Sequence, residues 1–147
     1  MRSAQSRGAG TLSALDRLRC EVVPVLRAGV DLADGLARAD RLLAAGCRVL
    51  EVTIETEQGR SLLEALRARH AGSYLLGAGT LTHPDQVAYV AHVGVDFAVS
   101  PGLDPEIVET ARRLRLPYIP GVVTPTEVQR ARGLGCRVLK LFPAGVL

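Results

Sequence analysis

The 147-residue chain contains a single lysine, Lys140, although 17 arginines are spread along it. Lys140 interrupts an otherwise apolar run, Val138-Leu139-Lys140-Leu141-Phe142-Pro143. Burial in apolar surroundings lowers the pKa of an amine, and a neutral amine can attack a ketone to form a Schiff base, which a guanidinium cannot do. The pattern therefore favours an imine-forming nucleophile. The alternatives are a lysine on an exposed strand or one whose amine extends to the surface.

Chemistry beside an imine needs a proton shuttle, and Glu51 is the candidate. The five residue types Gly-Cys-Arg-Val-Leu precede both Glu51 and Lys140. Because strand side chains alternate, the shared pattern places Glu51 and Lys140 on matching faces of their strands, with Thr53 and Phe142 on the same faces. We expect the carboxylate and the amine to face each other across one interior. The alternative is a structural salt bridge between them.

Short β-branched runs recur every 20 to 27 residues, each followed by an amphipathic helical pattern such as 32–43 or 61–66. The runs begin near Val22, Val49, Leu75, Phe97, Tyr118 and Val138. Single helices between strands, without hairpin signals, predict right-handed crossovers and a parallel sheet. The expected fold is α/β, of the (β/α)₈ TIM-barrel type, with about six strands present.

Helix boundaries are marked by known capping patterns. Thr124-Pro125-Thr126-Glu127 predicts a capping box, and the segments 82–85 and 104–106 follow a similar pattern. Glycines at 46, 94 and 135 are expected to end helices before the next strand.

Polar and small residues follow the predicted strands at their carboxyl ends, where barrel sites form. Thr53 follows Glu51 on its strand, and Gly77-Ala78-Gly79-Thr80 ends the third strand. The glycines would let a substrate or a neighbouring strand approach, since the run lacks the full dinucleotide-binding pattern. Pro101 lies in a tight turn at the same rim.

Composition excludes several classes of protein. The charge of +3 comes from scattered arginines, with few aromatics, so nucleic-acid binding is disfavoured. No apolar run approaches the ~18 residues of a membrane span, which predicts no membrane partner. Residues 1–12 contain no secretory signal; they are expected to be a disordered tail, with a short transit peptide as the alternative.

Neither a metal nor a cofactor is predicted. The three cysteines form no C-x-x-C pair, which favours a reducing, cytoplasmic location over a disulfide framework or zinc site. The histidines lack partners at metal-ligand spacing and are expected at the surface or at helix caps; they are His70, His83 and His92.

An ordered set of motifs extends from Val22 to Ala144: V-P-V-L-R, V-L-E-V-T, G-A-G-T, S-P-G-L, I-P-G-V-V-T-P-T-E and L-K-L-F-P-A. This set resembles the 2-keto-3-deoxy-6-phosphogluconate (KDPG) / 4-hydroxy-2-oxoglutarate (KHG) aldolases. The resemblance implies a class I aldolase of carbohydrate metabolism, of the Entner-Doudoroff type, usually a homotrimer and independent of metal. Such an enzyme cleaves a keto acid to pyruvate plus glyceraldehyde 3-phosphate or glyoxylate.

The resemblance also implies roles for individual residues. Lys140 would be the Schiff-base residue, Glu51 the general acid/base and Thr80 a contact to the pyruvyl carboxylate. The further predicted substrate contacts are Arg27, Thr53, Gly79, Pro101 and Phe142.

Two features depart from the family pattern. Glu55 stands where many members carry an arginine, and Arg27 is the candidate to supply that positive charge. Residues 13–147 would make a partial barrel without strands seven and eight, which carry the phosphate-binding turns. The alternatives are therefore an inactive barrel fragment that associates through open sheet edges, or a different pyruvate-using lyase on the same barrel.

Overall fold

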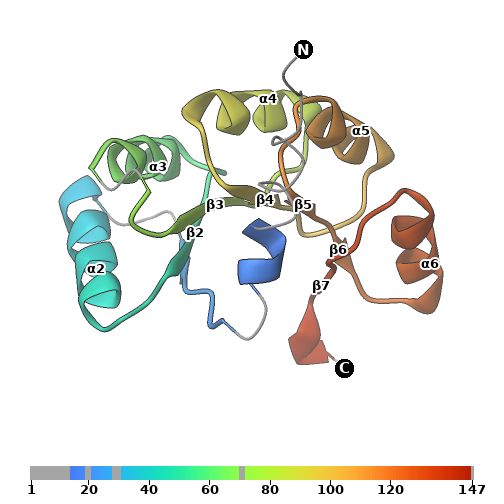
Figure 1. Cartoon of the computed structure of the whole chain (residues 1–147), viewed down its shortest axis with the longest axis horizontal. Coiled ribbons are helices and arrows are strands. Elements are labelled where there is room, and N and C mark those ends of the chain that lie inside the picture. The colour runs from blue at the N-terminus through green and yellow to red at the C-terminus, as the bar shows by residue number, and fades with distance from the viewer. Residues whose placement is uncertain (1–13, 19–20, 28–30, 70–71, 147) are drawn as a thin grey trace, which may run out of the picture.

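The computed structural model describes residues 14–18, 21–27, 31–69 and 72–146. Within them, strands and helices alternate as the sequence predicts (Figure 1). The strands are β1 (Val25–Leu26), β2 (Val49–Thr53), β3 (Leu75–Gly79), β4 (Phe97–Val99), β5 (Tyr118–Ile119), β6 (Gly121–Val122) and β7 (Lys140–Leu141). The helices are α2 (Leu32–Ala44), α3 (Glu57–Arg69), α4 (Pro84–Val93), α5 (Pro105–Arg113), α6 (Pro125–Gly133) and a short 3₁₀ helix, Ala144–Val146.

The strand pairs are parallel throughout the described sheets. One sheet has the order β1-β2-β3-β4-β5, and the other pairs β6 with β7. The helices form an arc on the outer side of the strands, and the blue residues near the N-terminus lie on the concave side (Figure 1). Each strand followed by a helix on the same outer side is the arrangement of a (β/α) barrel, here open between β1 and β7.

The described residues form seven strand segments where the sequence predicted about six, because Pro120 divides the fifth. Proline lacks the N–H that a continuous ladder needs. The backbone nevertheless continues through it: Ser100 N donates to Ile119 O at 3.1 Å on one side, and Lys140 N donates to Pro120 O at 2.9 Å on the other. The fifth strand thus connects the two sheets and carries β7 into the arc.

Two apolar layers line the strands. The larger one packs between the strands and the helices and includes Leu50, Val52, Leu76 and Ala98. The smaller one lies on the inner face and contains Val49, Leu75, Phe97, Val99 and Ile119, with Leu15, Leu18, Val23 and Val138 packed against it. Alternate residues of each strand therefore face opposite layers, as strand geometry requires. Val49 belongs to the inner layer and Val138 packs against it, which is the placement that the predicted phase of Glu51 and Lys140 requires.

The helix boundaries agree with the capping predictions. Thr124 and Glu127 form the expected capping box at the start of α6, and Asp104 caps α5. At α4 the Gln86 side chain accepts from the backbone N–H groups of Thr82 and His83. The glycines at 46, 94 and 135 all have positive φ, as expected for helix ends.

The last strand differs from expectation. The apolar run around Lys140 predicted a strand buried on both faces, but Leu141 is 54% exposed and Phe142 36% exposed. The strand also begins at Lys140 rather than near Val138, and the first begins at Val25 rather than near Val22. The reason is that β7 and β1 each have a sheet neighbour on one side only.

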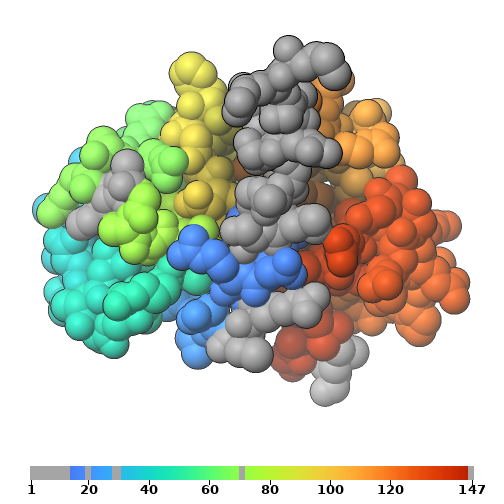
Figure 2. Space-filling model, viewed as in Figure 1, coloured from blue at the N-terminus to red at the C-terminus, as the bar shows by residue number. Residues whose placement is uncertain are grey.

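The space-filling view from the same side shows the blue residues near the N-terminus between the cyan and the orange-red parts of the chain (Figure 2). No helix within the described ranges is long and apolar enough to cross a membrane. The predicted disordered tail, residues 1–12, and His70 lie outside the described residues.

Candidate active site

Glu51 is a buried carboxylate on the inner face of β2, only 5% exposed. Burial raises its pKa above the ordinary value of 4.5 because it disfavours the charged form. The nearby charges of Lys140 and Arg27 act in the opposite direction and offset part of this effect. The three residues predicted to share a site therefore interact electrostatically, with the carboxylate at the centre.

Lys140 begins β7, and the residue as a whole is partly buried. Its Nζ lies 4.9 Å from the centroid of the Phe142 ring, a distance at which an ammonium is attracted to the ring face. Both Lys140 and Glu51 lie in the described part of the chain, and no salt bridge joins them there. Their longer-range interaction leaves the amine available for a reactant, which argues against the salt-bridge alternative.

The other predicted site residues lie at the carboxyl ends of successive strands. Arg27 follows β1 and is exposed, while Thr53 is the buried last residue of β2. Pro101 follows β4, and its carbonyl lies so close to Gly121 that a Cβ there would meet the oxygen at 2.0 Å. This convergence is typical of parallel α/β sites.

Thr80 follows β3 and has a left-handed backbone, with φ of 65°. For a β-branched residue this conformation is unusual and costs about 1–2 kcal/mol. Such strain is concentrated at functional sites, where the surrounding structure holds it. Here the neighbouring backbone is held by Leu81 N, which donates to Val99 O at 3.2 Å.

The inner face of β3 carries Leu75 at its start and then two glycines, Gly77 and Gly79, in place of larger residues. Gly77 lies in register with both Glu51 and Phe97, and a Cβ on it would meet the Phe97 ring at 2.2 Å. The ring therefore lies over Gly77 and provides apolar surface in the same register line as Glu51. Sequence reasoning placed Phe97 only at a strand start; the signal that could have found it is an aromatic residue in register with a glycine.

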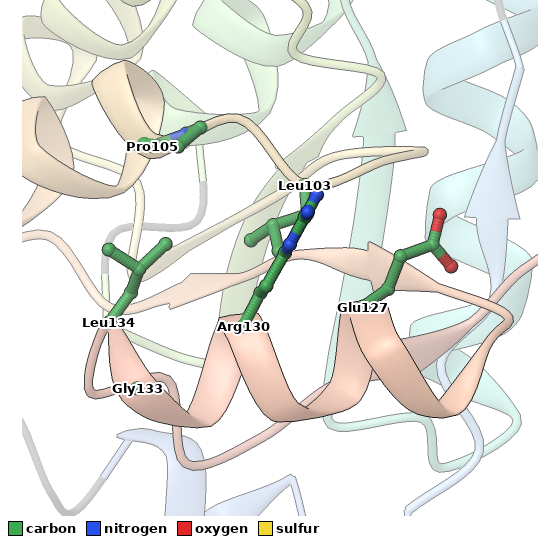
Figure 3. A pocket seen from close by; sticks show the side chains of 6 residues that line it. All are labelled: Leu103, Pro105, Glu127, Arg130, Gly133 and Leu134. Carbon is green, nitrogen blue, oxygen red and sulfur yellow. The ribbon is translucent and has the colours of Figure 1, made fainter.

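Two of the cavities that the described residues form lie outside the inner face of the sheet. The larger, about 400 Å³, opens between α6 and the segment that enters α5 (Figure 3), and none of the predicted site residues lines it. A smaller one, about 200 Å³, borders Pro101 at the rim. Among the described residues, no group of three or more His, Cys, Asp or Glu side chains is placed to hold a metal ion.

The geometry brings a primary amine and a buried carboxylate to one interior, with a threonine and an arginine at the same strand ends. A primary amine can condense with a ketone, and a carboxylate whose pKa is raised is a stronger base than an ordinary carboxylate and can take up and return protons. The arrangement can therefore support acid/base chemistry at a carbon next to an imine.

Comparison with known sequences points to the same chemistry. A family model described as KDPG and KHG aldolase matches residues 15–147. The 2-dehydro-3-deoxy-phosphogluconate aldolase of Dickeya dadantii is 39% identical over 125 residues, which cover 84% of this chain and 57% of that protein. The KHG/KDPG aldolase of Escherichia coli is 37% identical over 123 residues, with the same coverage. The chain thus spans little more than half the length of these relatives.

Solved structures agree with the sequence comparison. A KDPG aldolase from Legionella pneumophila, with pyruvate captured as a covalent carbinolamine intermediate, superposes with a TM-score of 0.78 at 36% identity over 84% of this chain and 59% of that one. The aldolase of Zymomonas mobilis with 3-phosphoglycerate gives 0.81 at 31% identity, over 92% and 63%. By sequence and by fold, this chain belongs to the KDPG and KHG aldolase family.

Proposed function

We propose that the protein is a class I, Schiff-base aldolase. It cleaves a 2-keto-3-deoxy sugar acid phosphate or 4-hydroxy-2-oxoglutarate to pyruvate and an aldehyde, glyceraldehyde 3-phosphate or glyoxylate. The observation that carries the proposal is the buried Glu51 carboxylate, which interacts with the single lysine across the inner face of a parallel barrel. The names of the relatives support an enzyme over a fragment that only associates through its sheet edges.

Each step has a residue to perform it. The Lys140 amine adds to the substrate ketone, and loss of water from the carbinolamine leaves a protonated imine. Glu51 takes the proton of the C4 hydroxyl while the C3–C4 bond breaks. The electron pair of that bond moves into the protonated imine, which becomes an enamine, and C4 leaves as the aldehyde. Glu51 then returns the proton to C3, and water hydrolyses the imine to pyruvate and the free amine.

The remaining residues are proposed to bind substrate. Thr80 and Arg27 would hold the pyruvyl carboxylate, with Thr53, Pro101 and Phe142 forming the wall around the pyruvyl group. Gly79, also predicted to contact substrate, would act from behind the Glu51 side chain that covers it. Arg27 takes the role of the family arginine that Glu55 replaces. Its charge already influences Glu51, which supports a place within electrostatic reach of the same ligand. Neither a cofactor nor a metal takes part in this scheme.

The half-reaction with pyruvate alone tests the proposal. Lys140 and Glu51 should exchange the methyl protons of pyruvate for deuterium in D₂O, which NMR measures, and borohydride should trap pyruvate on Lys140. Lys140→Arg keeps the charge but cannot form the imine, so exchange should fall by at least 10³-fold and trapping should vanish. Exchange or trapping that persists in Lys140→Arg would contradict the proposal, as would a complete lack of both in the wild-type chain.

We further propose a cytoplasmic homotrimer as the working form of the enzyme. The family resemblance supports it, and one structure that matches 87% of this chain, at 27% identity and a TM-score of 0.79, is a protein cage designed by fusing symmetric oligomeric domains. Light scattering coupled to size-exclusion chromatography would measure the number of subunits.

A further inference from the structure

The inner face of β3 lacks side chains at two alternate positions, Gly77 and Gly79, and each space is filled from a neighbouring strand. The Phe97 ring fills the space over Gly77. The Glu51 side chain fills the space over Gly79: a Cβ there would lie 2.0 Å from Glu51 Oε1, 2.8 Å from Cδ and 3.0 Å from Cγ. Contacts this short do not occur, so a side chain at position 79 and the present Glu51 conformation exclude each other.

Glu51 and Gly79 are not partners in the sheet register, so the contact between them requires the Glu51 side chain to lie along the strand direction. Glu51 pairs with Gly77, whereas Gly79 pairs with Thr53, and Ile54 N donates to Gly79 O at 3.1 Å. The Glu51 side chain therefore extends past its own partner toward the carboxyl end of the sheet. Thr80 follows β3 at that end, and Lys140 pairs with Gly121, beyond the end of β5. The contact with Gly79 therefore limits how far the carboxylate extends toward this end of the sheet.

We propose that Gly79 is a positioning residue: its bare Cα is the wall that holds the Glu51 carboxylate in its buried, proton-exchanging position. The consequence for catalysis rests on the proposed function, whereas the steric coupling does not. With a methyl group at 79, the carboxylate has to move off the β3 surface against which it is now buried. Gly79 has no positive φ, so alanine fits the backbone itself.

The first experiment measures the coupling by thermal unfolding, independently of activity. Gly79→Ala is expected to lower the unfolding midpoint by roughly 5 °C or more, as overpacking does. Glu51→Ala removes the atoms that clash, so Gly79→Ala should cost less than half as much in the Glu51→Ala background as in the wild type. Gly133→Ala is the matched control, because a Cβ there meets nothing within 4 Å. Strictly additive effects of the two substitutions would overturn the proposal.

The second experiment follows deuterium exchange into pyruvate as a function of pH. Gly79→Ala should lower the maximal rate about 10- to 100-fold with little change in the pyruvate concentration for half-maximal rate. The acidic limb of its pH–rate profile should move to lower pH, because a carboxylate displaced from its buried position is better solvated and has a lower pKa. A purely structural loss would leave the limb in place and would overturn the positioning role.

A shorter carboxylate provides a rescue test. Glu51→Asp removes the outermost atoms, which make the shortest contacts with the added methyl, and keeps only the Cγ position at 3.0 Å. The double variant Glu51→Asp/Gly79→Ala should therefore be no slower than the slower single variant by more than about 3-fold. If the two losses multiply instead, Gly79 does not act through Glu51. If the wild-type chain exchanges no pyruvate protons, the proposed function fails, while the unfolding measurements still decide the coupling.

Discussion

At the scale of single residues, Glu51 combines a functional role with a cost in stability. Burial is the largest influence on this carboxyl and raises its pKa above 4.5. The folded protein therefore holds the Glu51 proton more tightly than the unfolded chain does. By linkage, this stabilises the fold fully at pH values below 4.5, and the stabilisation is lost as the pH rises through the folded-state pKa. Above the folded-state pKa the protein contains an ionised carboxylate that the fold disfavours.

Glu51→Gln tests this trade-off between stability and activity. The amide is neutral at every pH, so the variant should unfold at a higher temperature than the wild type at pH 7, and the difference should disappear as the pH falls below 4.5. Pyruvate exchange should fall about 10²- to 10⁴-fold, because no base remains. Differential scanning calorimetry across pH and NMR exchange measure the two effects. A variant less stable than the wild type at pH 7 would show that attraction to Lys140 and Arg27 exceeds the cost of burial.

Residue types predicted part of this site, but contacts across the sheet did not follow from them. The lone lysine and the repeated Gly-Cys-Arg-Val-Leu run were enough to place Glu51 and Lys140 on one inner face. Phe97 was not found, because its position over Gly77 depends on strand register rather than on a motif. The exposure of Leu141 and Phe142 was not predicted, because an apolar strand has the same sequence pattern whether it has a neighbouring strand on both sides or on one side only.

At the scale of elements, the site is a set of strand ends, and β1 contributes Arg27. The register Val25↔Glu51 sets this short strand directly against β2, so the residue after it reaches the rim beside the carboxylate. Arg27→Ala should weaken pyruvate binding about 10- to 100-fold with little change in the rate at saturation. Arg27→Ala should also move the acidic limb of the pH profile of pyruvate exchange to higher pH, because the loss of a cation raises the pKa of Glu51. Isothermal titration and the exchange profile measure both, with Arg48→Ala as a remote control; unchanged affinity would remove Arg27 from the site.

Element boundaries could be predicted where a local interaction defines them. The Thr124–Glu127 capping box and the glycine helix ends need only neighbouring residues, and all were found. Pro120 shows the opposite case. A proline predicts the end of a strand, yet strand pairing continues on both sides of Pro120, whose carbonyl oxygen accepts a hydrogen bond from Lys140 N in β7. The partner that keeps the strand in place comes from another part of the chain.

At the scale of the whole molecule, the proposed ligand contacts connect the two ends of an open arc. Lys140 lies on β7 and Arg27 follows β1, which are the terminal strands of the two sheets, while Thr80 follows β3 near the middle. A pyruvate imine on Lys140 whose carboxylate contacts Arg27 and Thr80 would join these strands. Ligand binding should therefore stabilise the edges of the arc more than its centre.

Pyruvate should raise the unfolding midpoint of the whole chain. At about 100 times its dissociation constant the gain is about 2.7 kcal/mol, or roughly 5–10 °C for a domain of this size. Hydrogen exchange read by mass spectrometry should show peptides of β1 and β7 becoming protected together, with those of α4 and β4 little changed. Lys140→Arg should show neither effect, because the bridge depends on the covalent bond to the amine. Uniform protection of all strands, or the same rise in midpoint for Lys140→Arg, would mean that pyruvate does not join the two ends.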